Sequence, residues 1–293
     1  MDTTYDAVVI GGGPAGLQAT LTLGRVHRRV LMLDSGSYRN DPAAHMHNVV
    51  THDGTPPAEF RMSARKELAA YETVSVREET ATSVAAVDAG FHVALGDELV
   101  TTRSVLLATG LTDTLPDKAG LAELFGSVVA HCPFCHGHEF AGRPVGILGA
   151  ASAGHLPRLV GPIASRVTIY TDGEELTAEL PADVAVRTDR VTGVCPSSLG
   201  ATLSFEEGPS EDVGGLFVST RLAQRAPFAE QLGLTMLESG CVEVDPFGRT
   251  SLPGVHAAGD MAHLAALPMP MASVMTAAAS GQAAAAALVA FVL

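Results

Sequence analysis

Basic residues are scarce in this chain. Among its 293 residues, 18 are Lys or Arg and 32 are Asp or Glu, which gives a formal net charge of -14 at pH 7. Nucleic-acid backbones and anionic lipid headgroups are themselves negative, so a chain of this charge binds them only through a local basic patch. The few basic residues are scattered along the sequence. We therefore predict no nucleic-acid partner and no role at a membrane surface.

Cysteine is also rare, with four residues. The chain opens with Met1-Asp2-Thr3-Thr4-Tyr5, without the basic segment and apolar core of a secretory signal, so we expect a cytoplasmic protein. In that reducing compartment four cysteines do not indicate a disulfide framework. Cys132 and Cys135 form one C-x-x-C motif, which points to redox chemistry or a metal. Cys195 and Cys241 stand alone and are expected to behave as small apolar residues.

Charge is absent from residues 271–293, a run long enough to span a bilayer. Its first half contains Ser273, Thr276, Ser280 and Gln282, and its many alanines suit a helix buried against a sheet better than a helix in lipid. We predict no membrane segment and keep a spanning helix as the alternative. The whole composition, 47% hydrophobic and 17% charged, is typical of a well-packed globular protein with two domains.

A complete dinucleotide-binding pattern stands at the start of the chain. The apolar run Tyr5–Ile10 predicts a strand, Gly11-Gly12-Gly13-Pro14-Ala15-Gly16 a turn, and the residues after it a helix. A second strand, Arg29–Leu33, ends at Asp34, 18 residues after Gly16. The glycines let the backbone approach a pyrophosphate at the helix N-terminus, and the acid accepts hydrogen bonds from ribose hydroxyls.

The rest of the chain predicts an α/β fold with two Rossmann-like, three-layer dinucleotide-binding domains. Further strands are expected at residues 84–87, 91–95 and 104–108, and a second strand–turn–strand unit at residues 144–148, 149–154 and 166–170. We assign residues 1–113 and 246–293 to a discontinuous first domain and residues 114–245 to a domain inserted into it.

A third motif lies near the end of the chain. Residues 250–260 predict a tight turn, a short buried strand and an exposed acid, Asp260, at the tip of that strand, followed by a helix over residues 271–293. An acid at this place could hold a ribityl hydroxyl, with the dipole of the next helix directed at a flavin.

These three motifs, in this order and spacing, resemble the low-molecular-weight thioredoxin reductases over nearly the whole chain. The resemblance implies bound FAD, thiol/disulfide chemistry at Cys132 and Cys135, a homodimer and a rotating middle domain. It also implies that FAD is contacted by Gly11, Gly13, Pro14, Ala15, Gly16, Asp34, Ser35, Arg39, Asn40, Ala108, Thr109, Gly110, Gly259 and Asp260.

The second glycine turn departs from the family pattern. It has Ala151 at the middle glycine position, where a methyl group would hinder the approach of a pyrophosphate. After the next strand come Asp172, Glu174 and Glu175 with no Lys or Arg among them, a segment that repels the 2′-phosphate of NADPH. We expect this domain to bind NADPH poorly, and NADH only a little better.

The cysteine motif departs as well, because His136 stands where thioredoxin reductases have an Asp. The C-x-x-C-H-G pattern resembles the FAD-dependent dithiol oxidases of the gliotoxin and holomycin pathways, which pass electrons to oxygen without a nicotinamide. That resemblance makes Cys132 the exchanging cysteine and Cys135 the one nearer the flavin. His136 is the first choice for acid/base catalysis and His138 the second, and Glu139 could orient either imidazole.

The sequence thus predicts an FAD dithiol oxidase whose partners are a small-molecule dithiol and O2, with H2O2 as product and no metal. The alternatives are an NAD(P)H-dependent thioredoxin or disulfide reductase and a non-catalytic flavin-binding redox sensor. Haem attachment at C-x-x-C-H and zinc bound by these cysteines and histidines are weaker hypotheses. His45, His47 and His52 either line a substrate pocket or lie in solvent. Met269, Met271 and Met275 either line a pocket or pack in the core, with core packing as the default expectation.

Overall fold

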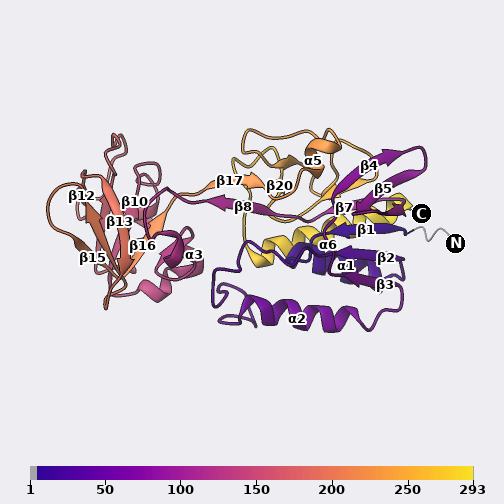
Figure 1. Ribbon diagram of the computed structural model, residues 1–293, viewed down its shortest axis with the longest axis horizontal. Coiled ribbons are helices and arrows are strands. Elements are labelled where there is room, and N and C mark those ends of the chain that lie inside the picture. Colours follow the sequence, from indigo (N-terminus) through magenta and orange to yellow (C-terminus); the bar gives the residue numbers. More distant parts are fainter. Residues whose placement is uncertain (1–4, 293) are drawn as a thin grey trace. The chain divides into compact units, whose positions relative to one another are not determined.

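The computed structural model describes residues 5–292 and divides the chain into two compact units (Figure 1). The first unit contains the chain up to Arg39, Ala58–Thr112 and the chain from Leu222 onward. The second unit contains Asn40–Pro57 and Asp113–Arg221. The strands β8 (Leu111–Thr114) and β17 (Arg221–Gln224) pair with each other where the chain passes between the units.

Two segments lie in a different unit from the one that the sequence suggested. Residues 222–245 belong to the first unit because Phe228, Ala229 and Leu234 pack into its core, so the chain returns at Leu222 and not at residue 246. Residues 40–57 follow the first glycine motif in sequence but pack with the second unit. Neither segment carries a motif that would reveal its packing partner.

Five parallel strands form the central sheet of the first unit, in the order β19-β7-β1-β2-β3. In that order they are Val255–Ala257, Val105–Leu107, Ala7–Ile10, Val30–Leu33 and Val74–Arg77. The strands β1, β2 and β7 are buried along their whole length, because both faces of a parallel sheet are covered. The turn after β1 lies at the point where the strand order reverses, the usual ligand position in such sheets.

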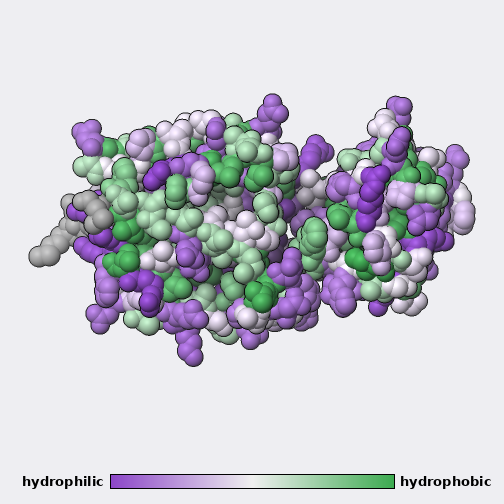
Figure 2. Space-filling model, turned by 180° about the vertical axis from the view of Figure 1, so that it is seen from behind, coloured by the Kyte–Doolittle hydropathy of each residue, from purple (hydrophilic) through white to green (hydrophobic). Residues whose placement is uncertain are grey.

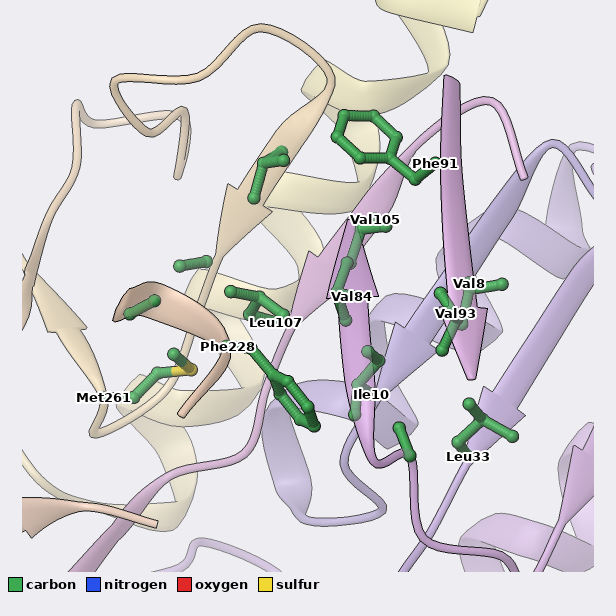
Figure 3. Close-up of a cluster of buried hydrophobic side chains, with 14 of the residues drawn as sticks. Val8, Ile10, Leu33, Val84, Phe91, Val93, Val105, Leu107, Phe228 and Met261 are labelled. Carbon is green, nitrogen blue, oxygen red and sulfur yellow. The ribbon is translucent and has the colours of Figure 1, made fainter. Parts of the chain in front are cut away.

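Helices cover one face of this sheet and a small antiparallel sheet covers the other. The helices are α1 (Pro14–Arg25), α2 (Pro57–Leu68) and α6 (Val274–Val292), and the antiparallel strands are β4 (Ser83–Val87), β5 (Gly90–Leu95) and β6 (Glu98–Thr102). Figure 3 shows the core between the two sheets, where Val84, Phe91 and Val93 face the parallel strands. Phe228 of the short helix α5 (Phe228–Gln231) fills the same core.

The second unit repeats this plan, which confirms the predicted pair of Rossmann-like domains. Its parallel sheet has the order β12-β11-β10-β16-β9, and its antiparallel sheet has the order β13-β14-β15. The parallel strands are, in that order, Ala185–Arg187, Arg166–Tyr170, Pro144–Leu148, Gly215–Val218 and Val129–Ala130; the antiparallel ones are Val191–Pro196, Ala201–Phe205 and Glu211–Val213. Its remaining short elements are η1 (Ala122–Leu124), α3 (Pro133–His136), η2 (His138–Phe140) and α4 (Leu156–Val160), whereas the short paired strands β18 (Val242–Glu243) and β20 (Ala262–His263) belong to the first unit.

The uncharged C-terminal helix packs inside the first unit. Helix α6 is long and apolar enough to cross a membrane, with a mean hydropathy of 1.5 over Val274–Phe291. Ala284, Ala285 and Leu288 on one of its faces are nevertheless buried in the same core as α1. The two helix backbones lie so close that a Cβ atom on Gly281 would come within 2.1 Å of the Ala15 carbonyl oxygen. Such close contact requires small residues. The same small, uncharged residues left a membrane-spanning helix as an alternative in the sequence.

The methionines before and within α6 correct one prediction. Met269, Met271 and Met275 were expected in the core, but their exposed fractions are 48%, 65% and 46%. Met269 and Met271 lie in an irregular segment that contains two prolines, where no helical or strand periodicity directs side chains inward, and Met275 is exposed in the first turn of α6. On the face shown in Figure 2, hydrophobic residues are interspersed with hydrophilic ones on each unit.

Candidate functional site

The first glycine turn brings three backbone segments into close contact. Gly11 has a φ of +123°, and a Cβ atom on it would lie 2.2 Å from the Ala108 carbonyl oxygen. Gly16 leaves no more room, since its Cβ would lie 1.8 Å from the Gly11 carbonyl oxygen. Gly13 faces open space at the start of α1, with Pro14 in the first turn. A ligand can therefore approach the backbone at Gly13 while the other two glycines fix the turn.

Asp34 lies at the end of β2 with 2% of its surface exposed. Its carboxylate accepts hydrogen bonds from the Gly36 amide (3.0 Å), the Tyr38 hydroxyl (2.6 Å) and Arg65. Burial and the bond to Asp34 raise the pKa of Tyr38 to about 12. Gly12, which the sequence prediction left out, is required here because a Cβ on it would overlap the Asp34 carboxylate.

A pocket of about 540 Å³ opens beside Asp34. It is lined by Asp34, Ser35, Gly36, Tyr38, Ala58, Arg61, Met62, Arg65 and Glu78. The Arg61 guanidinium lies 3.7 Å from the centre of the Tyr38 ring. Tyr38, Arg61 and Arg65 were not among the residues predicted from the sequence. The arginines come from α2, and no motif marks them.

The C-terminal motif meets the same site from the other end of the chain. Gly259 has a φ of +77°, and its amide donates a hydrogen bond to the Ser280 hydroxyl at 2.9 Å. Asp260 was expected to be exposed, but its side chain is only 20% exposed and forms an ion pair with Arg39 at 2.8 Å. The prediction was wrong on exposure because the sequence does not show the partner, 221 residues away.

These segments of the first unit fit a dinucleotide such as FAD. The 12-residue helix α1 directs its free N-terminal amides toward the open space at Gly13, which suits a pyrophosphate. Asp34 and its pocket suit the adenosine end, and Asp260 suits a hydroxyl-rich chain. Thr109 and Gly110 follow β7 at the same edge of the sheet, whereas Asn40 lies in the second unit.

The cysteine pair lies in the second unit, at the start of α3. Cys132 precedes this helix in an extended conformation and Pro133 occupies its first turn. The amides of Cys135 and His136 both donate to the Cys132 carbonyl oxygen at 3.2 Å. This turn brings the two Sγ atoms to 2.8 Å from each other, with both residues half-buried. Phe134, between them, is 67% exposed.

His136 is oriented by a backbone carbonyl. Its Nε2 lies 3.3 Å from the Gly126 carbonyl oxygen. A carbonyl only accepts, so Nε2 carries the hydrogen and Nδ1 carries the lone pair. Nδ1 is buried and has no hydrogen-bond partner among residues 5–292. Burial lowers the pKa of His136, which favours the neutral imidazole near pH 7. These features leave Nδ1 as the ring nitrogen that can accept a proton.

The neighbouring polar residues divide between exposed and paired positions. His138 is exposed, as are His45 and His52. Glu139 does not reach His138 but lies 3.6 Å from His47, and His47 also contacts Asp53 at 3.4 Å. In the described part of the chain no three His, Cys, Asp or Glu residues are arranged to hold a metal, so the zinc hypothesis finds no ligand set there.

The lone cysteines differ from each other. Cys241 is fully buried in the core of the first unit, as predicted for a small apolar residue, and burial raises the pKa of its thiol. Cys195 lies in strand β13 but is exposed, so it is not part of a hydrophobic core.

The second glycine turn is occupied by the chain itself. The Ala150 amide donates a hydrogen bond to Glu174 Oε2 at 2.8 Å, so a side-chain carboxylate sits where a phosphate oxygen would bind. The helix after this turn, α4, has five residues and begins only at Leu156. Asp172, expected to repel phosphate, forms an ion pair with Lys118 at 2.7 Å. Its charge is therefore compensated by a residue from outside the acidic segment.

Comparisons with known proteins agree with this architecture. A model of the pyridine nucleotide-disulphide oxidoreductase family matches residues 5–284. The thioredoxin reductase aclD of Aspergillus oryzae is 36% identical over 277 residues, covering 87% of this chain and 88% of the relative. The thioredoxin reductase sirT of Leptosphaeria maculans is 36% identical over 285 residues, with 88% and 87% covered.

Solved structures give the same result. The structure of HlmI is 32% identical with a TM-score of 0.88, covering 98% of this chain and 92% of that one. An oxidoreductase from Agrobacterium tumefaciens is 31% identical with a TM-score of 0.88, covering 98% of each chain. This chain therefore belongs to the pyridine nucleotide-disulphide oxidoreductase family, an FAD-binding family, and is a thioredoxin reductase-like thiol-disulfide oxidoreductase.

Proposed function

We propose that this protein is an FAD-dependent dithiol oxidase that closes a disulfide in a small-molecule dithiol, with O2 as electron acceptor and H2O2 as product. The observation that carries the proposal is the Glu174 carboxylate on the Ala150 amide. A nicotinamide dinucleotide would have to displace this carboxylate and bring its own negative pyrophosphate next to it. With that entry for electrons obstructed, the dithiol itself is the electron source.

The cysteine pair supplies the exchange chemistry. A substrate thiolate attacks the Cys132 sulfur of the Cys132–Cys135 disulfide and releases the Cys135 thiolate. The second substrate thiol then attacks the substrate sulfur of the mixed disulfide, which frees Cys132 and closes the substrate disulfide. The Cys132 and Cys135 assignments are carried over from the family resemblance. The Sγ separation of 2.8 Å supports re-formation of the protein disulfide without rearrangement of the turn.

His136 handles the proton in this scheme. Because Nε2–H is held by Gly126, Nδ1 is the atom that takes a proton from a substrate thiol. Bound FAD would supply the two-electron acceptor that is re-oxidised by O2. The sum is a dithiol plus O2 giving a disulfide plus H2O2, and the protein returns to its disulfide form.

The relatives named above keep a second function open. The names of aclD and sirT describe thioredoxin reductases, and a reductase would take electrons from NADPH or NADH. The C-x-x-C-H sequence and the occupied second turn favour the oxidase. A redox sensor without turnover is disfavoured by the unpartnered His136 Nδ1, because a passive switch does not need a base.

Anaerobic stopped-flow absorbance of the flavin band separates these functions. The purified protein is mixed with dithiothreitol, with NADPH or with NADH, and then exposed to air. For the oxidase we expect bleaching by the dithiol alone, recovery in air and loss of bleaching in Cys135→Ser. Rapid bleaching by a nicotinamide would establish the reductase and refute the oxidase. Bound FAD that neither donor bleaches would indicate the sensor.

Removing the obstructing carboxylate tests the argument on nicotinamide exclusion. We expect Glu174→Ala to bind NADH at least about tenfold more tightly than the unaltered protein, because one charge repulsion and one competing acceptor are lost. Binding is measured by calorimetry, with Glu175→Ala as the matched loss of a neighbouring acid. Equal affinities in all three proteins would show that Glu174 does not guard the turn.

The partners and location follow from the same proposal. We propose a homodimer in the cytoplasm with no membrane or nucleic-acid partner. Sedimentation equilibrium of the FAD-loaded protein checks the first of these statements, and a monomer at micromolar concentration would refute it.

A further inference from the structure

Residues 40–57 form a tightly folded loop in the second unit. Met46 pairs with Thr55 in an antiparallel bridge, and Met46 and Val49 are buried. Asp53 accepts a hydrogen bond from the Asn48 amide at 2.7 Å. Thr51 has a φ of +72°, a left-handed conformation that is costly for a β-branched residue and persists only when its surroundings impose it.

This loop contacts residues 126–139, which we call the cysteine segment, at a residue before His136 and at a residue after it. The Pro42 backbone lies against Gly126, where an added Cβ would come within 2.5 Å of the Pro42 carbonyl oxygen. Gly126 is the residue whose carbonyl holds His136. On the other side, His47 Nε2 lies 3.6 Å from Oε1 of Glu139, which follows His136 by three residues. The loop is therefore in position to affect the proposed base.

His47 lies between two carboxylates. Its Nδ1 is 3.4 Å from Asp53 Oδ2 and its Nε2 is 3.6 Å from Glu139 Oε1, with 26% of the side chain exposed. Carboxylates only accept hydrogen bonds, so both contacts are favourable when both ring nitrogens carry hydrogen. As an ordinary surface ion pair this arrangement would stabilise the fold very little. Both His47 and Glu139 nevertheless act electrostatically on His136, so this arrangement also influences the proposed base.

The charges around His136 oppose each other. Burial, the largest effect, lowers the pKa of His136; the Glu139 carboxylate raises this pKa, and a positive charge on the His47 ring lowers it. The hydrogen bond with the Gly126 carbonyl also raises this pKa. Removal of one charge at His47 or Glu139 would therefore leave the other uncompensated.

We propose that His47 is a positioning residue for the dithiol exchange, which holds loop 40–57 against the cysteine segment through Glu139 and offsets the Glu139 charge beside His136. The inference rests on the proposed function for the reaction that it serves. Its geometry and its test depend only on the cysteine segment and loop 40–57.

The test is an NMR titration of the His136 ring in the FAD-loaded protein, with the signal assigned by its loss in His136→Gln. In His47→Gln we expect the His136 pKa to rise by on the order of half a pH unit, as for a unit charge within about 10 Å of a partly buried group. In Glu139→Gln we expect a fall of similar size. His47→Lys places a cation between the carboxylates and should retain a low His136 pKa.

The control is His45→Gln, because His45 is an exposed histidine of the same loop. This variant should leave the His136 titration unchanged. Opposite shifts in His47→Gln and Glu139→Gln support the proposal. Absent shifts, or shifts of the same sign in both variants, overturn it and mean that the loop only shields His136 from solvent.

A kinetic measurement distinguishes positioning from simple structural support. The pH midpoint of flavin reduction by dithiothreitol should move with the His136 pKa in His47→Gln, whereas a merely structural defect lowers the rate equally at every pH. The titration keeps its meaning if a nicotinamide proves to be the electron donor. Failure of this inference is thus distinguishable from failure of the oxidase proposal.

Discussion

At the scale of single residues, His136 shows what the sequence could and could not predict. The C-x-x-C-H spacing identified it as the candidate base, next to Cys135. Which nitrogen acts is decided by the Gly126 carbonyl, ten residues earlier, and by burial of the ring. Neither can be seen in a sequence pattern, because both depend on how the loop before the cysteines folds back.

Replacement of His136 by Gln tests its role as base. A Gln amide can still donate a hydrogen bond toward Gly126 but cannot accept a proton. We expect flavin reduction by dithiothreitol to slow by at least about 100-fold near pH 7, the usual contribution of a general base, and to lose its inflection at the His136 pKa. Stopped-flow measurements from pH 5 to 8, roughly the range in which histidine titrates, check this.

The exposed His138 provides the matched comparison. His138→Gln should change the rate by less than about twofold, because a group that is exposed to solvent and has no fixed partner transfers protons no better than water or buffer. A large loss in His138→Gln together with a near-normal His136→Gln would exchange the roles of the two histidines.

At the scale of elements, the contact of α1 with α6 sets two effects against each other at Gly281. Gly→Ala in an exposed helix gains up to about 1 kcal/mol of helix propensity. Here the new methyl group would lie 2.1 Å from the Ala15 carbonyl oxygen, and overpacking costs about 1–3 kcal/mol or more. We expect the cost of overpacking to exceed the gain in helix propensity, so Gly281→Ala should lower the melting temperature by a few degrees. A melting temperature above that of Gln282→Ala, an exposed neighbour, would contradict this contact.

Strand β19 carries a buried histidine that makes stability depend on pH. His256 is 3% exposed, and neither ring nitrogen has a hydrogen-bond partner within the described residues. Burial lowers its pKa from 6.5 to about 4. Above pH 6.5 the ring is neutral in both the folded and the unfolded state, so it has no effect there. Between pH 6.5 and 4 only the unfolded state takes a proton, and this costs the fold up to about 3 kcal/mol.

Replacement of His256 by Leu removes this titration. We expect His256→Leu to be at least as stable as the unaltered protein at pH 7, because no buried nitrogen is left unsatisfied. Its melting temperature should fall less steeply as the pH drops from 6.5 to 4. Parallel curves for the two proteins in that interval would show that His256 is not the group responsible.

At the scale of the whole molecule, the sequence predicted the two repeated domains because each contains two neighbouring strands with a glycine-rich turn after the first, a pattern of local contacts. Loop 40–57 and residues 222–245 could not be assigned in the same way. Their place is fixed by long-range packing, such as Pro42 on Gly126 and Phe228 between two sheets. The two glycine turns differ in their fitness to bind a dinucleotide. The sequence showed this difference only in part, as Ala151 and a run of acids, and the structure adds that Glu174 accepts a hydrogen bond from the second turn itself.

This asymmetry predicts how the molecule melts. Each unit has hydrophobic clusters of its own, and the residues that fit FAD, apart from Asn40, lie in the first unit. A ligand that binds one folded unit stabilises that unit alone, by about 3–4 kcal/mol at 100 to 1,000 times its Kd. In calorimetry of the apoprotein we therefore expect two unfolding transitions. Added FAD should raise the midpoint temperature of one of them, and added NADH should raise the midpoint temperature of neither. Leu216→Ala, in the core of the second unit, should lower only the transition that FAD leaves unchanged. A single transition that FAD raises as a whole would mean that the two units unfold together.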